Sequence, residues 1–552
     1  MLAADDAQIV EWESRLRRMV AALEWPDPSV SIDRHAGGAS LAFTAPLDQL
    51  LAATEVNEWA WHGAAFTARG LPLPQAPGHP ATWDFDSAVE TIRRFAADES
   101  NCKAMMLLAI ASQHGLPAFY DDEFLSVGAG QGSRTWSLDE LPSNLADVDW
   151  TSLHDIPTVL VTGSNGKTTT VRLLAAMFRE AGTRAGFNCT DGVFIDGEQV
   201  ESGDYSGPSG ARRVLRDTRV QAAVLETARG GILRKGLAVN RADAGIVTNI
   251  SPDHFGEYGV HDLARLADAK LVLARAIGSQ GVLVLNADDP LLTAKSRAIE
   301  CPIAWFSLDD SQALMVAHRQ QGGATCGVSG NRMLLSSLGA SHDLGDVLAM
   351  PLTLSGSARY NIANLAGAAL LAATVGIPVE IIAGVLAGFG SRRDDNPGRL
   401  ERWMIGGATV FLDYAHNPEG LAGLLTVAAS VREATGGRMG LLLGQAGNRD
   451  DDAIAQLARA AAAARPDFIV LKDLQGYLRG RAPGEVPALL QEELARQGLP
   501  LSSMRTLLPE VEAARAILNW SRAGDVLVLP VHNLSARAAL VQWLDAEAGA
   551  AS

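Results

Sequence analysis

Residues 156–170 read Ile-Pro-Thr-Val-Leu-Val-Thr-Gly-Ser-Asn-Gly-Lys-Thr-Thr-Thr, and this stretch decides the fold. The apolar and β-branched run 158–162 predicts a buried strand, and the glycines after it predict a tight turn. Apolar residues follow at helical spacing from Val171 to Phe178, so the turn opens a helix. Together these elements predict a phosphate-binding loop, because free backbone N–H groups and the positive end of the helix dipole face the turn.

The loop carries the side chains that a nucleotide phosphate requires. Lys167 offers a positive charge to the β- and γ-phosphates, and Thr168 offers a hydroxyl to Mg²⁺. The spacing departs from the usual GxxxxGK[ST] pattern, since the position five before Gly166 is Val161 and the first glycine is Gly163. A chance glycine turn is the alternative, but the ordered strand-turn-helix context favours a nucleotide site. The predicted nucleotide ligands of the loop are Gly163, Ser164, Asn165, Gly166, Lys167, Thr168 and Thr169.

The length and composition place the chain among large α/β proteins. A chain of 552 residues exceeds what one hydrophobic core organises, so we expect three domains, at residues 1–153, 154–391 and 392–552. The hydrophobic content of 47% and the 54 glycines are typical of an α/β protein rich in tight turns. The net charge of −17 disfavours a nucleic-acid partner, although a local basic cluster can still bind a small anion.

Cysteine usage and the terminal sequence indicate a cytoplasmic protein without a membrane segment. The four cysteines lack Cys-x-x-Cys spacing and nearby histidine pairs, so we expect reduced thiols and neither disulfides nor zinc. The first residues lack the basic region and apolar core of a signal peptide. The longest apolar run, 365–377, is interrupted by Gly367 and Gly376, which predicts a packed helix instead of a membrane span.

Residues 1–153 predict a small α+β domain. Helical patterns lie near 7–23, 47–61 and 87–111, and the segment holds seven of the eleven tryptophans. We interpret these tryptophans as core residues, since packing is their commoner use, with stacking on a ligand as the alternative. Residues 128–133 resemble a dinucleotide fingerprint, but no long helix follows, so we predict a turn there.

Strands alternate with helices after residue 154, which predicts two doubly wound domains. In the first, the expected strands are 158–162, 222–226, 244–249 and 282–286, and the expected helices lie near 167–181, 208–217 and 262–277. An Asp-Gly turn within 191–200 predicts a hairpin, and the glycine-rich residues 307–350 predict a small β insertion. In the second, the expected strands are 408–412, 439–443, 468–471 and 526–529, and the helices lie near 418–433, 452–464, 485–496 and 511–519.

The predicted fold class is therefore α/β, with a central doubly wound P-loop domain, a smaller C-terminal Rossmann-like domain and the N-terminal α+β domain. Ligands of such sheets bind at the carboxyl ends of the strands. Two domains whose strand ends face each other form a cleft that can close around a ligand.

Polar residues at two further strand ends are candidate magnesium ligands, since Mg²⁺ prefers oxygen donors. Glu226 closes one predicted strand, and His254 follows another in the segment Thr248-Asn-Ile-Ser-Pro-Asp-His254. Either residue alone is a weak signal, because a carboxylate at a strand end is usually solvated and a lone histidine usually has a structural role. Their order after the phosphate loop strengthens both candidates.

Residues 163–170 resemble the phosphate loop of the Mur ligase superfamily, whose members join a carboxylate to an amine with ATP. Other motifs in the superfamily's order extend the resemblance to residue 418 and make chance a poor explanation. Besides the segments that hold Glu226 and His254, they are Arg359-Tyr-Asn-Ile-Ala-Asn364, Asn396-Pro-Gly-Arg399 and Asp413-Tyr-Ala-His-Asn-Pro418. Part of this pattern has a structural alternative, because asparagines cap helices and Asn-Pro often opens one.

The resemblance implies a role for each matching residue. Glu226 and His254 would help Thr168 hold Mg²⁺. A carbamoylated Lys270 would bind a metal or position the γ-phosphate, whereas without the resemblance Lys270 would be interpreted as a solvated cation. Tyr360 stands where the superfamily has a histidine beside the adenine. The implied nucleotide contacts outside the loop are Asn361, Arg399, Asp413 and His416, and the implied catalytic residues are Lys167, Glu226, His254 and Lys270.

Within the superfamily, the chain is most similar to the second half of the cyanophycin synthetases, on residues 191–208, 226–236, 396–400 and 479–485. In those enzymes this half attaches arginine to the side-chain carboxylate of aspartate, and an ATP-grasp domain adds the aspartate. That domain has no room in the present sequence, so a separate ATP-grasp enzyme is a candidate partner. The candidate substrate residues are Arg229 and Arg234 for an acidic group and Arg479 and Arg481 for the amino acid, with solvated loop charges as the alternative.

These observations predict a cytoplasmic ATP-dependent amide ligase with ATP and Mg²⁺ as cofactors. It would activate a carboxylate, an acidic peptide being one candidate, as an acyl phosphate and join it to the amine of an amino acid. No nucleic-acid or membrane partner is expected, and a homo-oligomer stays open. Two other functions compete: an accessory nucleotide-binding partner of a separate ATP-grasp ligase, and a simple ATPase or kinase. The presence of Glu226, His254 and Lys270 favours catalysis.

Overall fold

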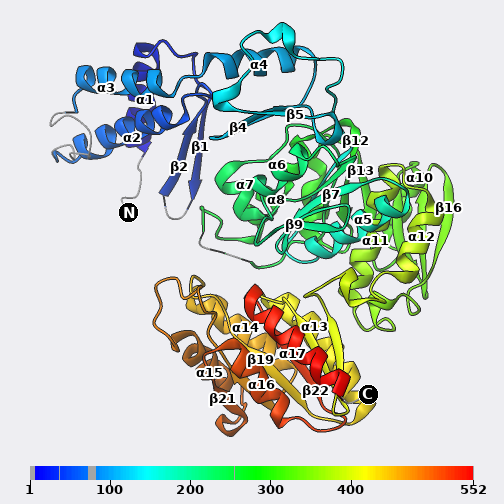
Figure 1. The fold of residues 1–552 in the computed structure, drawn as a ribbon. Coiled ribbons are helices and arrows are strands. Elements are labelled where there is room, and N and C mark those ends of the chain that lie inside the picture. Colours follow the sequence, from blue (N-terminus) through cyan, green and yellow to red (C-terminus); the bar gives the residue numbers. More distant parts are fainter. Residues whose placement is uncertain (1–5, 36–37, 72–82, 254, 256, 551–552) are drawn as a thin grey trace. The chain divides into compact units, whose positions relative to one another are not determined.

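The computed structural model describes residues 6–35, 38–71, 83–253, 255 and 257–550. It separates into two compact units. The first consists of the described residues of 1–129, 133–154 and 256–261, and the second of the described residues of 130–132, 155–255 and 262–552. The colours of Figure 1 follow the chain through both units, which are described here one at a time.

The first unit is an α+β structure with a tryptophan-rich core, as the sequence predicts. Three helices pack together over the antiparallel strand pair β1 (Val30–His35) and β2 (Gly38–Phe43), and Trp12, Trp59 and Trp83 are buried among them. These helices are α1 (Asp6–Ala22), α2 (Leu50–Thr67) and α3 (Phe85–Glu99). A second cluster forms where α4 packs on a three-stranded sheet around Trp136. Its elements are α4 (Cys102–Gln113), β3 (Ala118–Tyr120), β4 (Phe124–Val127) and β5 (Arg134–Ser137).

Two details of this segment bear on the predictions. The single helix expected over 87–111 is wrong, because Ser100 is extended and the side chain of Asn101 accepts a hydrogen bond from the backbone N–H of Ala104, which starts α4. The turn expected over 128–133 is confirmed, since only a short 3-10 helix, Gly130–Gly132, follows β4.

The second unit contains a sheet of eleven strands, ordered β16-β15-β14-β13-β12-β11-β6-β10-β7-β8-β9. The seven strands from β14 to β7 run parallel, and antiparallel pairs extend both edges. The strands are β6 (Thr158–Thr162), β7 (Ala185–Cys189), β8 (Gly192–Ile195), β9 (Glu198–Ser202), β10 (Ala222–Glu226), β11 (Ala242–Val247), β12 (Ile277–Asn286), β13 (Ile303–Phe306), β14 (Thr325–Ser329), β15 (Arg332–Ser337) and β16 (Ala340–Asp346). We call residues 158–388 the large-sheet region.

Helices bury both faces of this sheet. Val159 and Val161 of β6 belong to one hydrophobic cluster with α5, α11 and α12, whereas Leu160 between them is also buried but lies outside that cluster. Successive side chains of a strand point to opposite faces, so both faces are covered, as a continuous apolar strand requires. The helices of this region are α5 (Lys167–Glu180), α6 (Pro208–Arg216), α7 (Arg229–Lys235), α8 (Leu263–Leu271), α9 (Pro290–Lys295), α10 (Ala313–Gln320), α11 (Arg359–Thr374) and α12 (Val379–Gly388).

The predicted strands and helices of this region are largely confirmed, with one correction. The hairpin within 191–200 turns at Asp196 and Gly197, whose φ angles of +51° and +85° suit a tight two-residue turn. Residues 307–350 are not a separate β insertion. They contain α10, and β14 pairs in parallel with β13 through Phe306 and Cys326, so the segment continues the large sheet.

A second sheet follows, ordered β17-β18-β22-β19-β20-β21, in which only the β17–β18 pair is antiparallel. Its strands are β17 (Glu401–Ile405), β18 (Ala408–Asp413), β19 (Met439–Leu443), β20 (Phe468–Leu471), β21 (Met504–Thr506) and β22 (Val526–Pro530). Its helices are α13 (Pro418–Thr435), α14 (Asp451–Ala463), α15 (Glu485–Arg496), α16 (Glu510–Trp520) and α17 (Leu534–Ala550). We call residues 401–550 the small-sheet region.

This smaller sheet is also covered on both faces. Phe411 packs in a cluster with α13, α14 and α15, while its neighbours Val410 and Leu412 pack in another cluster with α16 and α17. Sequence patterns predict the four inner strands and the first four helices. They miss β17, β21 and the terminal helix α17.

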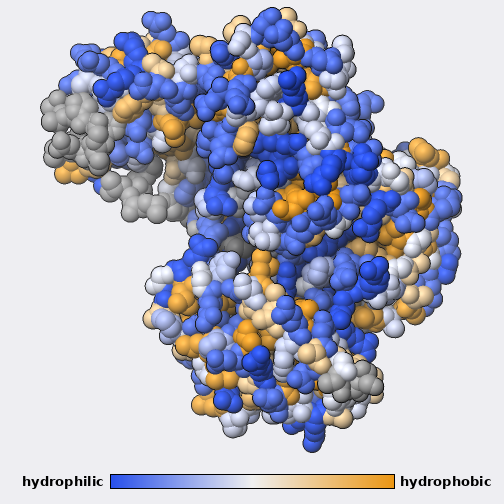
Figure 2. Space-filling model, in the orientation of Figure 1, coloured by the Kyte–Doolittle hydropathy of each residue, from blue (hydrophilic) through white to orange (hydrophobic). Residues whose placement is uncertain are grey.

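A membrane span requires a helix of sufficient length and apolarity. None of the helices in the described chain is both long enough and apolar enough to cross a membrane. The apolar run 365–377 lies mostly in α11, which is buried against the large sheet, so the prediction of a packed helix is confirmed. Hydrophilic residues cover most of the face shown in Figure 2, with hydrophobic residues in small groups.

Candidate active site

The predicted phosphate loop lies at the carboxyl end of β6, which is flanked by β10 and β11 in the large sheet. Its two glycines have φ angles of +148° at Gly163 and +85° at Gly166. A Cβ on Gly163 would lie 1.8 Å from Thr248 Oγ1, and one on Gly166 would lie 2.1 Å from Asn364 Oδ1. Both positions therefore require glycine for conformation and for space.

The segment after β11 holds the loop in place. The backbone N–H of Asn165 donates to Asn249 Oδ1 over 2.9 Å, and the Ser164 hydroxyl donates to the backbone oxygen of Ser251 over 3.0 Å. From α8, Lys270 Nζ donates to the backbone oxygen of Gly163 over 2.8 Å. The loop is thus ordered by contacts from two segments that lie far along the chain.

Thr168 and Glu226 meet at the start of α5. The Thr168 hydroxyl donates to Glu226 Oε2 over 2.9 Å, and the Thr190 hydroxyl donates to Glu226 Oε1 over 3.3 Å. Burial raises the pKa of Glu226, although the charge of Lys167 and the hydrogen bond from Thr168 oppose that shift. A hydroxyl and a buried carboxylate form an oxygen donor pair of the kind that suits Mg²⁺. The third predicted ligand, His254, lies outside the described residues.

Lys270 is a buried amine in the last turn of α8. Its side chain is 2% exposed, and burial, reinforced by the charge of Lys167, lowers its pKa to about 7. A substantial fraction of the side chain is therefore the neutral amine near neutral pH. The interpretation as an ordinary solvated cation does not apply to this lysine.

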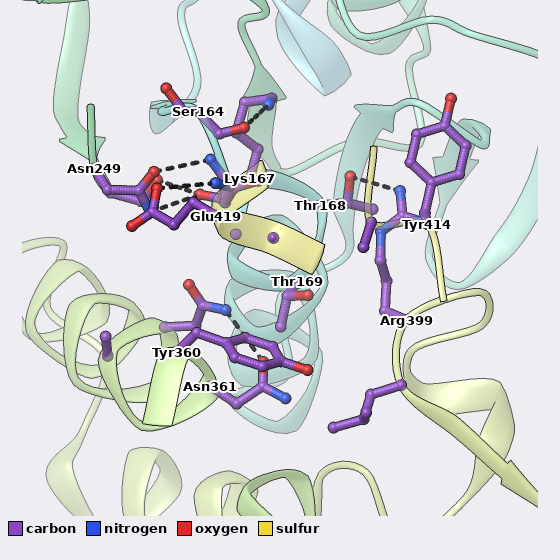
Figure 3. A pocket seen from close by; sticks show the side chains of 18 of the residues that line it. Ser164, Lys167, Thr168, Thr169, Asn249, Tyr360, Asn361, Arg399, Tyr414 and Glu419 are labelled. Carbon is purple, nitrogen blue, oxygen red and sulfur yellow. Dashed lines mark hydrogen bonds between the residues drawn. The ribbon is translucent and has the colours of Figure 1, made fainter. Parts of the chain in front are cut away.

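A cavity of about 280 Å³ opens above the loop, between the large-sheet and small-sheet regions of the second unit. Figure 3 shows α5 at its centre, with Tyr360 and Asn361 on one side and Arg399 and Tyr414 on the other. The lining residues from the large-sheet region include Ser164, Asn165, Gly166, Lys167, Thr168, Thr169, Thr190, Asn249, Asn286, Asp288, Leu308, Tyr360, Asn361 and Asn364. Those after residue 388 are Arg399, Leu400, Asp413, Tyr414, Ala415, His416, Glu419 and Gly420.

The small-sheet wall of the cavity is tied to the phosphate loop. Asn417 Nδ2 donates to Asn165 Oδ1 over 2.9 Å, and Asn165 Nδ2 donates to Glu419 Oε2 over 3.3 Å. Arg399 Nη2 donates to the Thr168 hydroxyl over 3.4 Å, with its guanidinium 4.6 Å from the centre of the Tyr414 ring.

Asp413 holds the backbone of this side of the cavity in place. Its carboxylate accepts hydrogen bonds from the backbone N–H groups of Leu400, over 2.6 Å, and Ala415, over 2.7 Å. Burial raises its pKa despite the nearby charge of Arg399. Asp413 therefore orders the loop that carries His416, in addition to facing the cavity.

The side of the cavity near α11 is apolar and amide-rich. Asn361 Nδ2 donates to the backbone oxygen of Leu352 over 3.0 Å, and Asn361 Oδ1 accepts from Asn364 Nδ2 over 3.2 Å. The Tyr360 ring approaches α13 so closely that a Cβ on Gly423 would lie 3.0 Å from Tyr360 Cδ1. Tyr360 thus packs across the cavity edge, where the sequence comparison with the superfamily expects a histidine.

The structure brings together most of the predicted site residues. The loop residues 164–169 and the residues Asn361, Arg399, Asp413 and His416 line the cavity, while Gly163, Glu226 and Lys270 lie directly behind the loop. The four candidate substrate arginines do not line it. Arg229 is buried at the start of α7, Arg234 and Arg479 are exposed, and Arg481 donates to Gly447, Arg449, Asp451 and Glu485.

Several cavity residues escape the sequence analysis. Asn286 ends β12 and Asp288 follows it, and Leu308 follows β13, at the strand ends where ligands of a parallel sheet bind. For Asn286 and Asp288 the available signal is a polar residue at or just after the end of a predicted strand. Glu419 gave no such signal, because an acidic residue in the first turn of a helix usually interacts only with the helix dipole.

Both sheet regions match models of known protein domains. A family model for the Mur ligase middle domain matches residues 161–372, and one for the Mur ligase glutamate ligase domain matches residues 398–530. Cyanophycin synthetase of Synechocystis sp. is 36% identical over 377 residues, which cover 68% of this chain and 42% of that protein. The chain belongs to the Mur ligase family.

Other relatives of this Mur ligase family member point the same way. Cyanophycin synthetase of Geminocystis herdmanii is 33% identical over 417 residues, 74% of this chain and 47% of that protein. The chain thus spans about half the length of these relatives. A UDP-N-acetylmuramoyl-L-alanyl-D-glutamate–2,6-diaminopimelate ligase of Corynebacterium glutamicum is 28% identical and matches 68% of this chain and 70% of its own.

Solved structures share the fold at lower identity. Mycobacterium tuberculosis folylpolyglutamate synthase complexed with ADP aligns with a TM-score of 0.51 and 20% identity, covering 70% of this chain and 90% of that chain. E. coli FolC in complex with ADP aligns with a TM-score of 0.50 and 18% identity, covering 71% and 89%. At this identity the likeness concerns the fold.

The packing of the phosphate loop leads to a stability prediction. Gly166→Ala should lower the free energy of unfolding by more than Gly182→Ala, measured by urea denaturation. Both glycines have φ angles near the same left-handed value, +85° and +80°, but a Cβ meets Asn364 only at Gly166 and has open space at Gly182. The control should cost about 1 kcal/mol from conformation alone. Equal losses in the two variants would contradict the packing described for the loop.

The buried amine leads to a pH prediction. Lys270→Met should stabilise the protein most below pH 7, because the wild-type fold there buries a charged ammonium. As pH rises from about 7 toward 10.5, the folded wild type has already lost the proton that its unfolded chain still binds, so the advantage of the variant shrinks. Unfolding in CO₂-free buffer across this range measures it.

Lys295→Met is the control for this pH series, since the Lys295 amine is partly exposed and paired with Asp268. It should show no comparable trend. A gain from Lys270→Met that stays constant with pH would mean that the buried amine is not perturbed as described.

Proposed function

We propose that the chain is an ATP-dependent amide ligase that activates a carboxylate as an acyl phosphate and joins it to the amine of an amino acid. The observation that supports this most is the cavity in which the phosphate loop of one sheet faces Arg399 and the Asp413–His416 segment of another. A nucleotide bound there would have its phosphates at residues 163–169 and a second substrate within reach from the small-sheet side.

In the proposed reaction, an oxygen of the substrate carboxylate attacks the γ-phosphorus of ATP, and ADP leaves. The amine nitrogen of the second substrate then attacks the acyl carbon, phosphate leaves and the nitrogen loses a proton. Lys167 and Arg399 would offset the negative charge of the phosphates, since both line the cavity. The contacts from Asn165 to Asn417 and Glu419 would keep water away from the acyl phosphate.

Thr168 and Glu226 would hold Mg²⁺, because a hydroxyl and a carboxylate oxygen already lie side by side there. His254 stays a predicted third ligand. When bound, the ion would supply charge stabilisation to the phosphoryl group in transfer.

The substrates are proposed as classes. The amine donor is an amino acid and the acid is a carboxylate, with an acidic peptide as one candidate. Arg481 is better suited to joining the segment 447–451 to the start of α15 than to binding substrate, because its donors are used within the protein. Arg229, Arg234 and Arg479 stay candidates outside the cavity.

Phosphate release tests the proposed function. Panels of amino acids and short acidic peptides are added with ATP and Mg²⁺, and release should require an acid and an amine together. Lys167→Met should reduce this rate by about 100-fold or more, as for other charge-stabilising groups, whereas Lys103→Met, at an exposed position, should leave it unchanged. Release that is independent of both substrates would indicate an ATPase. No release under any condition, with nucleotide binding intact, would indicate an accessory nucleotide-binding protein.

Carbamoylation of Lys270 has its own test. A neutral buried amine can react with CO₂, and the carbamate would place a negative charge behind the phosphate loop. With ¹³C-bicarbonate, the wild-type protein should give a carbamate signal in the ¹³C NMR spectrum that Lys270→Ala lacks, and Lys270→Ala should lose ligase activity. Full activity of that variant would remove the role assigned to Lys270.

A further inference from the structure

Asp191 is buried behind the cavity and contacts three arginines. Its side chain, in the turn between β7 and β8, is 5% exposed. Arg172 Nη2 lies 2.7 Å from Asp191 Oδ2, Arg537 Nη2 lies 2.5 Å from Oδ1, and Arg399 Nη2 lies 3.8 Å from Oδ2. Burial alone would raise the pKa of Asp191, but the three guanidinium charges lower it to about 2. The carboxylate therefore stays ionised.

The three arginines come from three different segments. Arg172 lies on α5, the helix that follows the phosphate loop, and Arg537 lies on α17. Arg399 lies in residues 389–400 between α12 and β17, which we call the connector. Arg172 Nη1 also donates to Asn396 Oδ1 over 3.1 Å and to the backbone oxygen of Pro397 over 2.8 Å. One carboxylate thus ties the phosphate-loop helix, the connector and the terminal helix together.

The connector is built around this cluster. Gly398 has a φ angle of +71°, and a Cβ at this position would lie 2.1 Å from Arg537 Nη1. The guanidinium of Arg537 therefore rests directly against the connector backbone. Asn396 Nδ2 donates to the hydroxyl of Thr169 over 3.2 Å, which joins the connector to the first turn of α5 as well.

The three arginines differ in how closely they approach Asp191. Arg399 is the farthest from the carboxylate, at 3.8 Å against 2.7 Å for Arg172 and 2.5 Å for Arg537, and the Asp413 and Glu226 carboxylates also act on its charge. Arg399 is also the one that lines the cavity, where its Nη2 reaches the Thr168 hydroxyl (Figure 3). Asp191 and Arg172 do not line it. Within the cluster, Arg399 is thus the cation that faces the cavity, and the Asp191 carboxylate lies behind it.

We propose that Asp191 is a positioning residue for nucleotide binding. It orients the Arg399 guanidinium toward the phosphates. Because Asp191 also pairs with Arg537, the orientation of Arg399 depends on α17 being packed in its place. This inference rests on the proposed use of ATP and deepens it. Asp191 would not touch the nucleotide. The ion pairs of Arg172 and Arg537 would keep the Asp191 carboxylate in place while Arg399 contacts a phosphate.

A mutant cycle tests the inference. ADP affinity is measured by calorimetry, and the KM for ATP and kcat are measured in the phosphate assay, for Asp191→Asn, Arg399→Met and the double variant. Asp191→Asn removes the charge and keeps the shape, and it should weaken ADP binding and raise the KM for ATP by about tenfold, with a smaller change in kcat. Because Asp191 acts through Arg399, the same substitution should have little further effect in the Arg399→Met background.

Two more variants keep the result interpretable. Glu201→Gln is the control, because Glu201 of β9 forms an exposed ion pair with Arg213 of α6, and its loss should leave ADP affinity unchanged. Arg537→Gln leaves the Asp191–Arg172 pair intact and should also weaken ADP binding. It serves as the test variant if Asp191→Asn does not fold.

The outcomes separate the two proposals. Wild-type ADP affinity in Asp191→Asn or Arg537→Gln would overturn the positioning role while leaving the ligase proposal intact. A loss from Asp191→Asn that is as large in the Arg399→Met background as in wild type would overturn it too, because the effect would then be structural. A wild-type protein that binds no nucleotide would overturn both.

Discussion

The contact between the Thr168 hydroxyl and the Glu226 carboxylate, buried where α5 begins, is the interaction on which the rest of the site depends. It joins the first turn of α5 to the end of β10, and it places two oxygen ligands beside the phosphate loop. Burial disfavours the charged form of Glu226, so this carboxylate needs positive charge nearby to stay ionised. Lys167 and Arg399 provide part of this positive charge, and the magnesium ion of a bound nucleotide would provide the rest.

Glycine makes this arrangement possible. At Gly163 and Gly166 the backbone passes within contact of Thr248 and Asn364, so the loop is clamped between segments that follow β11 and begin α11. Lys270 closes the loop from behind with a hydrogen bond to a backbone oxygen. The loop is thus preorganised by its neighbours, and a ligand would not have to order it.

The small-sheet region contributes through few but specific contacts. Asn165 of the loop meets Asn417 and Glu419 at the start of α13, and Arg399 meets Thr168. These polar contacts are the type that can break and re-form when a nucleotide enters, unlike a packed hydrophobic interface.

The sequence predicts local features well where the chemistry is local. The strand at 158–162, the glycine turn and helix α5 follow from residue type and spacing alone, as do the four inner strands of the small sheet. It fails where the answer depends on neighbours in space. Nothing in the sequence distinguishes the buried Lys270 from a solvated lysine on an amphipathic helix, apart from the family resemblance. Likewise, nothing in the sequence shows that the Asp191 carboxylate contacts arginines from α5 and α17, which lie more than 300 residues apart in the chain. Arg481 shows the opposite error. Its motif suggests a substrate-binding residue, whereas its guanidinium donates hydrogen bonds to neighbouring segments of the protein.

A crystal structure with a non-hydrolysable ATP analogue and Mg²⁺ tests the account most directly. The account predicts the phosphates against residues 163–169, the metal about 2.1 Å from Thr168 Oγ1 and coordinated by Glu226, and Arg399 within hydrogen-bond distance of a phosphate oxygen. A nucleotide bound elsewhere would contradict it. So would a metal that does not contact Glu226, with the hydrogen bond from Thr168 to Glu226 unchanged.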